Sequence, residues 1–324
     1  MNTPDTHTTQ SMKKFAKSSW GILKQSVVAF INGESFTHAS SIAFYTIFSL
    51  PAILLISLSV GSTLFERTDV QRELISQAGA LIGQGSAQEI ESIVLNAASD
   101  SDSWIARVVG IATLVLSATS VFLSLQLSIN QIWKIKPKPK KGFIKFIVNR
   151  LLSLAMVISM GFVLLVSLVF DTLLVMFQER LSDNLGGITL TIVTFLNVVL
   201  SLLFIAVLFG LMFKMLPDAK IKWRDVWVGS LVTTALFTGG KYLIGFYLGN
   251  SSFNSAYGAA GSLVIILVWV YYSALIFLFG AELTYIYTKE IGSGIEPYSN
   301  AVRIETIEIE KKQPLPPKET QAQV

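Results

Sequence analysis

Asp171, Lys241 and Asn197 each stand well inside a long apolar stretch of this chain. Counted from the nearest polar boundary at about 1.5 Å per helical residue, all three lie roughly 12–15 Å deep. An unpaired charge in an apolar medium costs at least about 2.5–3.5 kcal/mol. We therefore expect Asp171 to pair with Lys241, with Asn197 nearby.

Lys241 lies on one helical face with small and polar residues. The face consists of Thr234, Thr238, Lys241, Gly245 and Gly249. Three interpretations stay open: the ion pair only fixes helix packing, it forms a substrate or proton site in a cavity open to one side, or Lys241 faces lipid and snorkels to the surface.

A second polar layer is expected nearer the other end of the same stretches. Gln126 and Asn130 are one helical turn apart, Arg150 begins the next stretch, and Glu282 lies about 10 Å inside the last one. Glu282 is expected to pair with Arg150. This layer serves either as a structural lock or as a conducting gate.

Pro51 stands in the middle of the first apolar stretch. Proline removes one backbone donor, so it should kink that helix and leave the carbonyl of Ile47 to another partner. Such kinks serve transport in some membrane helices and are purely structural in others.

Common enzyme chemistry finds little support. The two histidines, His7 and His38, stand outside any metal-ligand pattern, and there is no cysteine. No phosphate-binding loop, nucleophile elbow or dinucleotide fingerprint occurs. We expect no metal, no cofactor and no enzymatic activity. The lysine-rich segment 134–141 favours anionic lipid headgroups over nucleic acid as partner.

The stretches that position these residues are long enough to span a bilayer. Forty residues, Tyr242 to Ala281, contain no charged side chain, whereas a single span needs about 20. The whole chain is 52% hydrophobic and 14% charged. We predict an all-α polytopic membrane protein with six transmembrane helices, at 38–61, 105–133, 148–177, 187–213, 226–249 and 257–284.

Lysine and arginine alternate between the loops, which predicts the orientation of the spans. The segment before the first span and the second and fourth loops are rich in them, whereas the first loop carries only Arg67 and Arg72 against seven acids. Both termini are therefore expected in the cytoplasm.

The remaining segments divide the chain further. Residues 12–36 carry an apolar stripe with lysines opposite, which predicts an amphipathic interfacial helix; a solvated helix packed on the loops is the alternative. The outer loop 62–103 should contain a helix that opens at a capping box at 86–89 and runs toward Asn96, and a second candidate helix runs from Thr68 to Leu81. The expected organisation is a disordered start at 1–11, the interfacial helix at 12–36, the membrane domain at 37–290 and a mostly disordered cytoplasmic tail at 291–324.

Several motifs resemble the YihY/virulence factor BrkB family over about residues 20–290. They are HASSIAFY at 38–45 with SLP at 49–51, WRDVWVGS at 223–230, AYGAAGSL at 256–263, VWVYYSA at 268–274 and GAEL at 280–283. The resemblance implies a six-helix protein of the bacterial cytoplasmic membrane with a role in the cell envelope. Some members carry the label ribonuclease BN, which the residues here do not support.

Three functional classes remain open. A transporter or flippase for a lipid or other amphipathic envelope component is favoured by the two polar layers, Pro51 and the basic loops. The alternatives are a scaffold for envelope assembly, which moves nothing, and an intramembrane enzyme acting on lipids. A homo-oligomer is compatible with each class.

Overall fold

The computed structural model describes residues 20–63, 66–82, 91, 104–138, 187–249 and 261–305. Within these ranges the chain is mostly helical, which confirms the predicted class in its coarse form. The helices are residues 20–32, α2 (Ser35–Gly61), α3 (Arg67–Ile82), α5 (Trp104–Ile132), α7 (Gly187–Met215), α8 (Trp223–Gly249) and α10 (Gly261–Glu290).

Five of these helices match predicted spans to within a few residues, and α3 matches the second candidate helix of the outer loop. The span predicted at 148–177 lies outside the described residues, as does the helix predicted to open at 86–89, apart from position 91. Two segments of the described chain are long and apolar enough to cross a membrane, namely Val198–Met215 and Leu263–Glu290.

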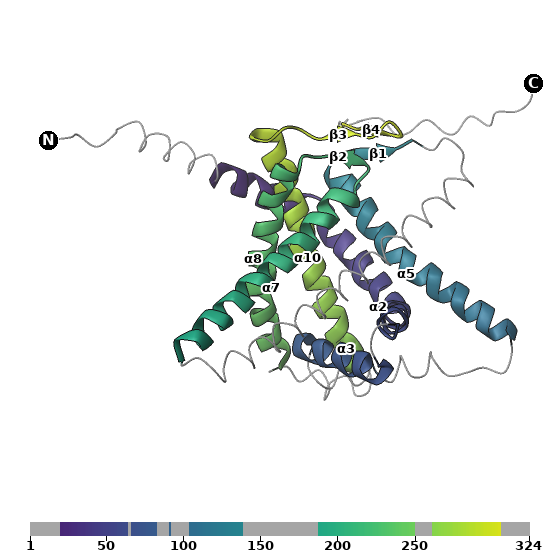
Figure 1. Ribbon diagram of the computed structural model, residues 1–324. Coiled ribbons are helices and arrows are strands. Elements are labelled where there is room, and N and C mark those ends of the chain that lie inside the picture. The colour runs from purple at the N-terminus through teal and green to yellow at the C-terminus, as the bar shows by residue number, and fades with distance from the viewer. Residues whose placement is uncertain are drawn as a thin grey trace, which may run out of the picture.

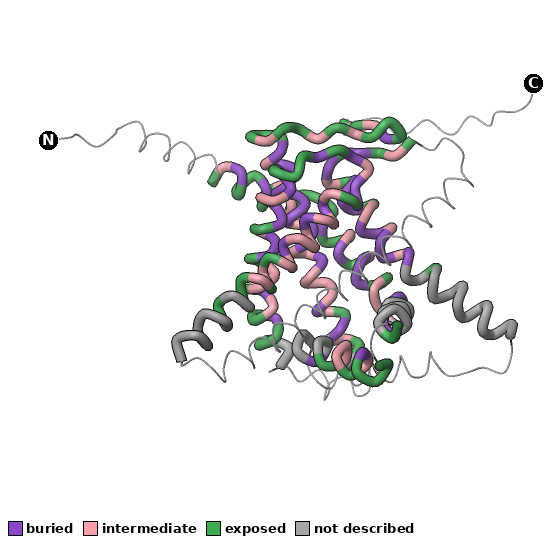
Figure 2. Tube along the Cα trace, viewed as in Figure 1, coloured by how far each residue is buried: buried purple, intermediate pink, exposed green. Residues whose placement is uncertain are grey.

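The helices are arranged lengthwise between two different ends (Figure 1). Helix 20–32 and all the short strands lie at one end, here called the strand end, and α3 lies across the opposite, α3 end. Helix α2 packs on α5 and α10, and α8 packs on α7 and α10. Buried residues are concentrated toward the strand end, while α5 and α7 diverge toward the α3 end (Figure 2).

Four short strands tie the strand end together. Strand β1 (Ile135–Pro137) pairs with β4 (Ala301–Arg303), and β2 (Ala219–Lys220) pairs with β3 (Glu296–Pro297), both antiparallel. The sequence predicted no strand and assigned 291–324 to a mostly disordered tail. Residues 291–305 are ordered instead, because the loops after α5 and α7 offer backbone groups with which they pair; 306–324 lie outside the described residues.

The core of the strand end is aromatic. Trp133 is 1% exposed and its Nε1 donates a hydrogen bond to the carbonyl of Ala281 at 3.1 Å. Phe213 stacks on Phe277 with ring centroids 5.2 Å apart. These contacts fix the end of α5 and the end of α7 on α10.

Helices α8 and α10 meet through a reciprocal pair of glycines and threonines. A Cβ on Gly229 would collide with Thr284, and a Cβ on Gly280 would collide with Thr233. Each threonine hydroxyl donates to a carbonyl of its own helix at 2.7 Å, Thr233 to Gly229 and Thr284 to Gly280. Because the hydroxyls are satisfied internally, the two backbones approach closely.

Helix 20–32 presents two faces. Ile22 and Ser26 are buried against the bundle, while Trp20, Val27 and Ile31 are 69%, 40% and 59% exposed. An exposed apolar face beside a buried one is typical of a helix at a lipid interface. The residues predicted to continue this helix to position 12 lie outside the described part.

Candidate cavities between α2, α5 and α10

Open space with polar and apolar side chains in its walls lies beside α2 and α5 at the strand end, in contrast to the glycine–threonine contact of α8 and α10. Two cavities of about 870 and 770 Å³ adjoin here. They share His38, Gln131 and Lys134 in their walls. We call them the first and the second cavity.

The first cavity lies between helix 20–32, the start of α2, and the ends of α5 and α10. Three lysines and three glutamates contribute to its wall, together with apolar side chains such as Val28, Ile132 and Ile286. The charged residues are Lys24, Lys134, Lys289, Glu34, Glu282 and Glu290. Its formal charge is therefore balanced, apart from His38.

The second cavity follows the contact between α2 and α5 away from the strand end. Its wall reaches Tyr45, seven residues beyond His38, which corresponds to about 10 Å along a helix. Hydroxyl groups of Ser41, Ser120 and Ser124 contribute to it. Ser41 and Ser120 donate to carbonyls one turn back, at 3.1 and 2.6 Å. A hydroxyl that donates in this way can still accept a hydrogen bond, as the oxygen of Ser41 could.

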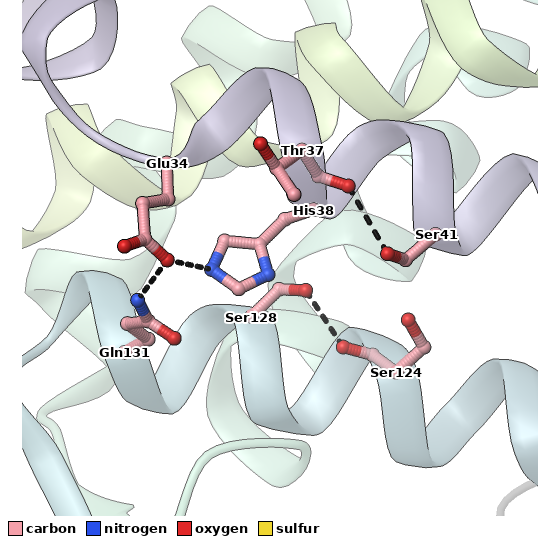
Figure 3. Close-up of polar contacts among 7 residues, drawn as sticks. All are labelled: Glu34, Thr37, His38, Ser41, Ser124, Ser128 and Gln131. Carbon is pink, nitrogen blue, oxygen red and sulfur yellow. Dashed lines mark hydrogen bonds and ion pairs between the residues drawn. The ribbon is translucent and has the colours of Figure 1, made fainter.

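Glu34 links two helices where the cavities meet (Figure 3). Its Oε2 accepts a hydrogen bond from Gln131 Nε2 at 2.7 Å and lies 3.9 Å from His38 Nε2. The Nε2 atom of His38 is buried and has no hydrogen-bond partner. His38 therefore contributes to both cavity walls without being fixed by a hydrogen bond through this nitrogen.

Lys134 has a strained backbone conformation and contributes to the walls of both cavities. It follows the end of α5 with φ at 55°, which makes it the one described residue other than glycine with a positive φ. A left-handed conformation costs a side-chain-bearing residue about 1 kcal/mol relative to glycine. A lysine retained at that cost points to a use for its ammonium.

Glu282 is buried at 8% exposure and contributes to the first cavity. Among the described residues, no hydrogen bond or ion pair reaches its carboxylate. The charge of Lys134 acts on it across the cavity without closing into an ion pair. The expected partner, Arg150, lies outside the described residues, so that pairing stays a prediction.

The other members of the predicted inner layer have different roles. Asn130 is 2% exposed and makes two hydrogen bonds with Asp218: its Nδ2 donates to Oδ2 at 2.8 Å, and the backbone N of Asp218 donates to Oδ1 at 2.9 Å. This pair fastens the end of α5 to the loop after α7. Gln126 is half-buried on α5.

The predicted outer layer is described only in part. Lys241 is half-buried on α8, and its Nζ lies 5.5 Å from the centroid of the Tyr242 ring. The hydroxyl of Thr238 is buried without a hydrogen-bond partner. Asp171 lies outside the described residues, as does the side chain of Asn197, so their pairing with Lys241 stays a prediction.

The glycine face predicted around Lys241 does not make the close contact of α8. Gly245 is exposed, and a Cβ there would meet nothing within 4 Å. The close approach uses Gly229 and Gly240 instead, which face Thr284 and Tyr272. Helix α2 continues through Pro51, and the kink expected there stays a prediction.

Two members of the cavity junction escaped the sequence analysis. Glu34 and His38 are four residues apart, which places them on one helix face. That spacing was available in the sequence, but their link to Gln131, 97 residues after Glu34, required the fold. Among the described residues, no cluster of His, Asp and Glu suits a metal ion.

Long apolar helices that place their charged side chains beside a cavity are typical of a helical membrane protein. The model of the virulence factor BrkB family matches residues 27–305 of the chain. The chain belongs to this family, which confirms the resemblance drawn from its motifs.

Relatives of the chain are named UPF0761 membrane proteins. One from Rhodospirillum centenum is 28% identical over 272 residues, covering 82% of this chain and 56% of its own length. One from Janthinobacterium is 28% identical over 252 residues, 76% of this chain and 54% of its own. The chain thus spans about half the length of the curated relatives it matches. No solved structure matches it.

Proposed function

We propose that this protein is a transporter or flippase-like protein that moves a lipid or another amphipathic envelope component, and that it catalyses no covalent reaction. The observation that carries the proposal is the pair of adjoining cavities along α2 and α5. A charged first cavity and a hydroxyl-containing second cavity offer a headgroup a polar route of about 10 Å beside apolar helix surface.

The membrane arrangement is part of the proposal. Six helices cross the cytoplasmic membrane of a bacterium, and the strand end with both termini faces the cytoplasm. The lysine-rich loops at the strand end support this orientation, because cytoplasmic loops retain an excess of positive charge. Anionic headgroups then bind these loops, the chain associates as a homo-oligomer, and nucleic acid is no partner.

A scaffold that moves nothing is the alternative. The close contact of α8 with α10 and the strands that tie the loops together favour it, because they leave little freedom at the strand end. Scaffold and transporter differ in whether a headgroup passes along α2 and α5.

Lipid movement in reconstituted vesicles tests the main proposal. Vesicles carry acyl-chain-labelled phosphatidylglycerol or phosphatidylethanolamine, and dithionite added outside bleaches the label in the outer leaflet. The protein should increase the bleached fraction beyond that of protein-free vesicles, with or without a pH gradient. Equal bleaching in both would contradict the transporter and favour the scaffold.

The orientation has its own test, since the native chain has no cysteine. A cysteine at Arg72, an exposed position of α3, should react in intact cells with an impermeant thiol reagent. A cysteine at Lys138, beside β1, should react only after the membrane is opened. Reaction at position 138 in intact cells would reverse the orientation.

A further inference from the structure

We propose that the first cavity binds the headgroup of an amine-bearing phospholipid, with the ammonium on Glu282 and the phosphate on Lys134. This inference rests on the proposed function and names a ligand class for it. It is carried by an unpaired buried carboxylate, a lysine that faces it without pairing, and the balanced charge of the wall.

The carboxylate of Glu282 has no partner within the part of the chain that the structure describes. Buried charges in proteins are normally paired, because desolvation without compensation is costly. Glu282 is more than nine-tenths buried, contributes to the cavity wall, and has no hydrogen bond or ion pair among the described residues. A cationic donor that enters the cavity supplies the partner that the described residues do not provide.

Lys134 supplies the opposite pole. Its charge acts on Glu282, yet the two side chains form no ion pair although they share the cavity. A carboxylate and an ammonium that contribute to one cavity without pairing match a ligand that carries both a cationic and an anionic group. Lysine is well suited to phosphate, as a point charge with three donors.

The charge count of the wall selects among lipid headgroups. Three lysines against three glutamates give no net attraction for an anionic headgroup, so a zwitterion fits better than phosphatidylglycerol. A primary ammonium donates three hydrogen bonds, whereas the quaternary ammonium of choline donates none. Glu282 therefore distinguishes phosphatidylethanolamine from phosphatidylcholine, although both carry the same net charge.

The surroundings of the cavity favour a lipid over a soluble compound. Helix 20–32 contributes Gly21, Val28 and Ala29 to the wall and presents Trp20 and Ile31 on its exposed apolar face. A volume of about 870 Å³ with apolar side chains beside the charges holds more than a headgroup. An acyl chain extending over helix 20–32 accounts for the remainder.

Native mass spectrometry of the delipidated full-length protein tests the inference. Phosphatidylethanolamine, phosphatidylcholine and phosphatidylglycerol with identical acyl chains are titrated in separate samples. The wild type should bind the ethanolamine lipid about tenfold more tightly than either other lipid, as expected for one charge-assisted hydrogen bond. Glu282→Gln should lose that preference, and Lys134→Gln should weaken the ethanolamine and glycerol lipids together.

Glu296→Gln is the control, because Glu296 is an exposed glutamate of β3 that contributes to neither cavity wall. It should keep the preference. A wild type without preference for the ethanolamine lipid, or a Glu282→Gln variant that keeps it, would overturn the proposal. Glycerophosphoethanolamine without acyl chains should bind much more weakly; if it binds as tightly as the lipid, the ligand is a soluble compound and the lipid assignment fails.

The binding experiment and the lipid-movement experiment can contradict the two proposals independently. A protein that prefers the ethanolamine lipid but moves none of it in vesicles contradicts the transporter and keeps the binding site. A protein that moves lipid without any headgroup preference contradicts the binding site and keeps the transporter.

Discussion

In two helix contacts of this protein, side-chain hydroxyls donate to backbone carbonyls of their own helix, but one contact is closely packed and the other adjoins a cavity. Between α8 and α10, threonine hydroxyls donate to carbonyls one turn back, and glycines opposite them let the backbones meet. Between α2 and α5, serine hydroxyls also donate one turn back, but a cavity lies beside them. Internally satisfied hydroxyls thus permit either close packing or a polar space, and the residue facing them decides which.

The same contrast separates two buried carboxylates. Asp225 is fully buried in the first turn of α8, where the helix dipole favours a negative charge, and its Oδ2 accepts a hydrogen bond from the backbone N of Ser293 at 2.9 Å. Glu282 is buried without such a bond. The Asp225 carboxylate is held by one backbone donor through Oδ2, although its Oδ1 has no hydrogen-bond partner, whereas the Glu282 carboxylate lies beside a cavity.

The largest change in stability is expected when a methyl group is added to the packed contact of α8 and α10. Gly229→Ala should lower the free energy of unfolding by about 2–3 kcal/mol, because the new Cβ collides with Thr284. The free energy is measured by titration with sodium dodecyl sulfate in mixed micelles. Gly245→Ala is the control, since its Cβ meets nothing within 4 Å, and it should be neutral or stabilising. Equal effects of the two variants would remove the contrast between the contacts.

Removing the enclosed carboxylate should have the next largest effect. Asp225→Ala should cost about 2 kcal/mol, because the backbone N of Ser293 loses its buried acceptor. The same titration measures it. Unchanged stability would mean that the buried bond to Ser293 contributes nothing.

A large side chain in the open contact should be tolerated. Ser41→Leu extends into the second cavity, so it should change stability by less than about 1 kcal/mol while reducing lipid movement in vesicles. Its stability is compared with that of Gly229→Ala, which adds fewer atoms but should lower the free energy of unfolding more. Full lipid movement in a stable Ser41→Leu protein would show that the second cavity is not on the route.

The smallest effect on stability is expected at the unpaired carboxylate. Glu282→Gln removes a buried charge that has no partner among the described residues, so stability should stay equal or rise by about 0.5–1 kcal/mol. The comparison with Asp225→Ala is direct, since both side chains are buried carboxylates. A loss as large as that of Asp225→Ala would assign Glu282 to the fold and support its predicted pairing with Arg150.

Most of the fold that could be predicted from the sequence followed from the length of its apolar stretches. The bounds of α2, α5, α7, α8 and α10 follow from charge-free stretches, because a membrane span needs a minimum apolar length. The strands could not be predicted in this way. They pair segments as far apart as Ile135 and Arg303, and each is only two or three residues long.

The sequence singled out two residues that contribute to the cavities, but it could not predict the contacts between distant segments that position them. The sequence singled out Asn130 and Glu282 for the inner layer, but Asn130 bonds to Asp218, 88 residues away. The small and polar face of α8 that the sequence singled out includes Gly245, whereas Gly229 makes the close contact with Thr284. Periodicity identifies faces of one helix, whereas the neighbouring helix determines which of these faces is used.

The strands after α10 also have a consequence for the order of assembly. Residues 296–303 pair with both earlier loops, and the backbone N of Ile304 donates to the carbonyl of Lys134 at 2.8 Å. A ribosome releases these residues only after α2, α5, α7, α8 and α10 have been synthesised. The helices can therefore insert and still shift against one another until this late segment pairs with the loops. The contacts at the strand end are then the last to form among those of the described residues.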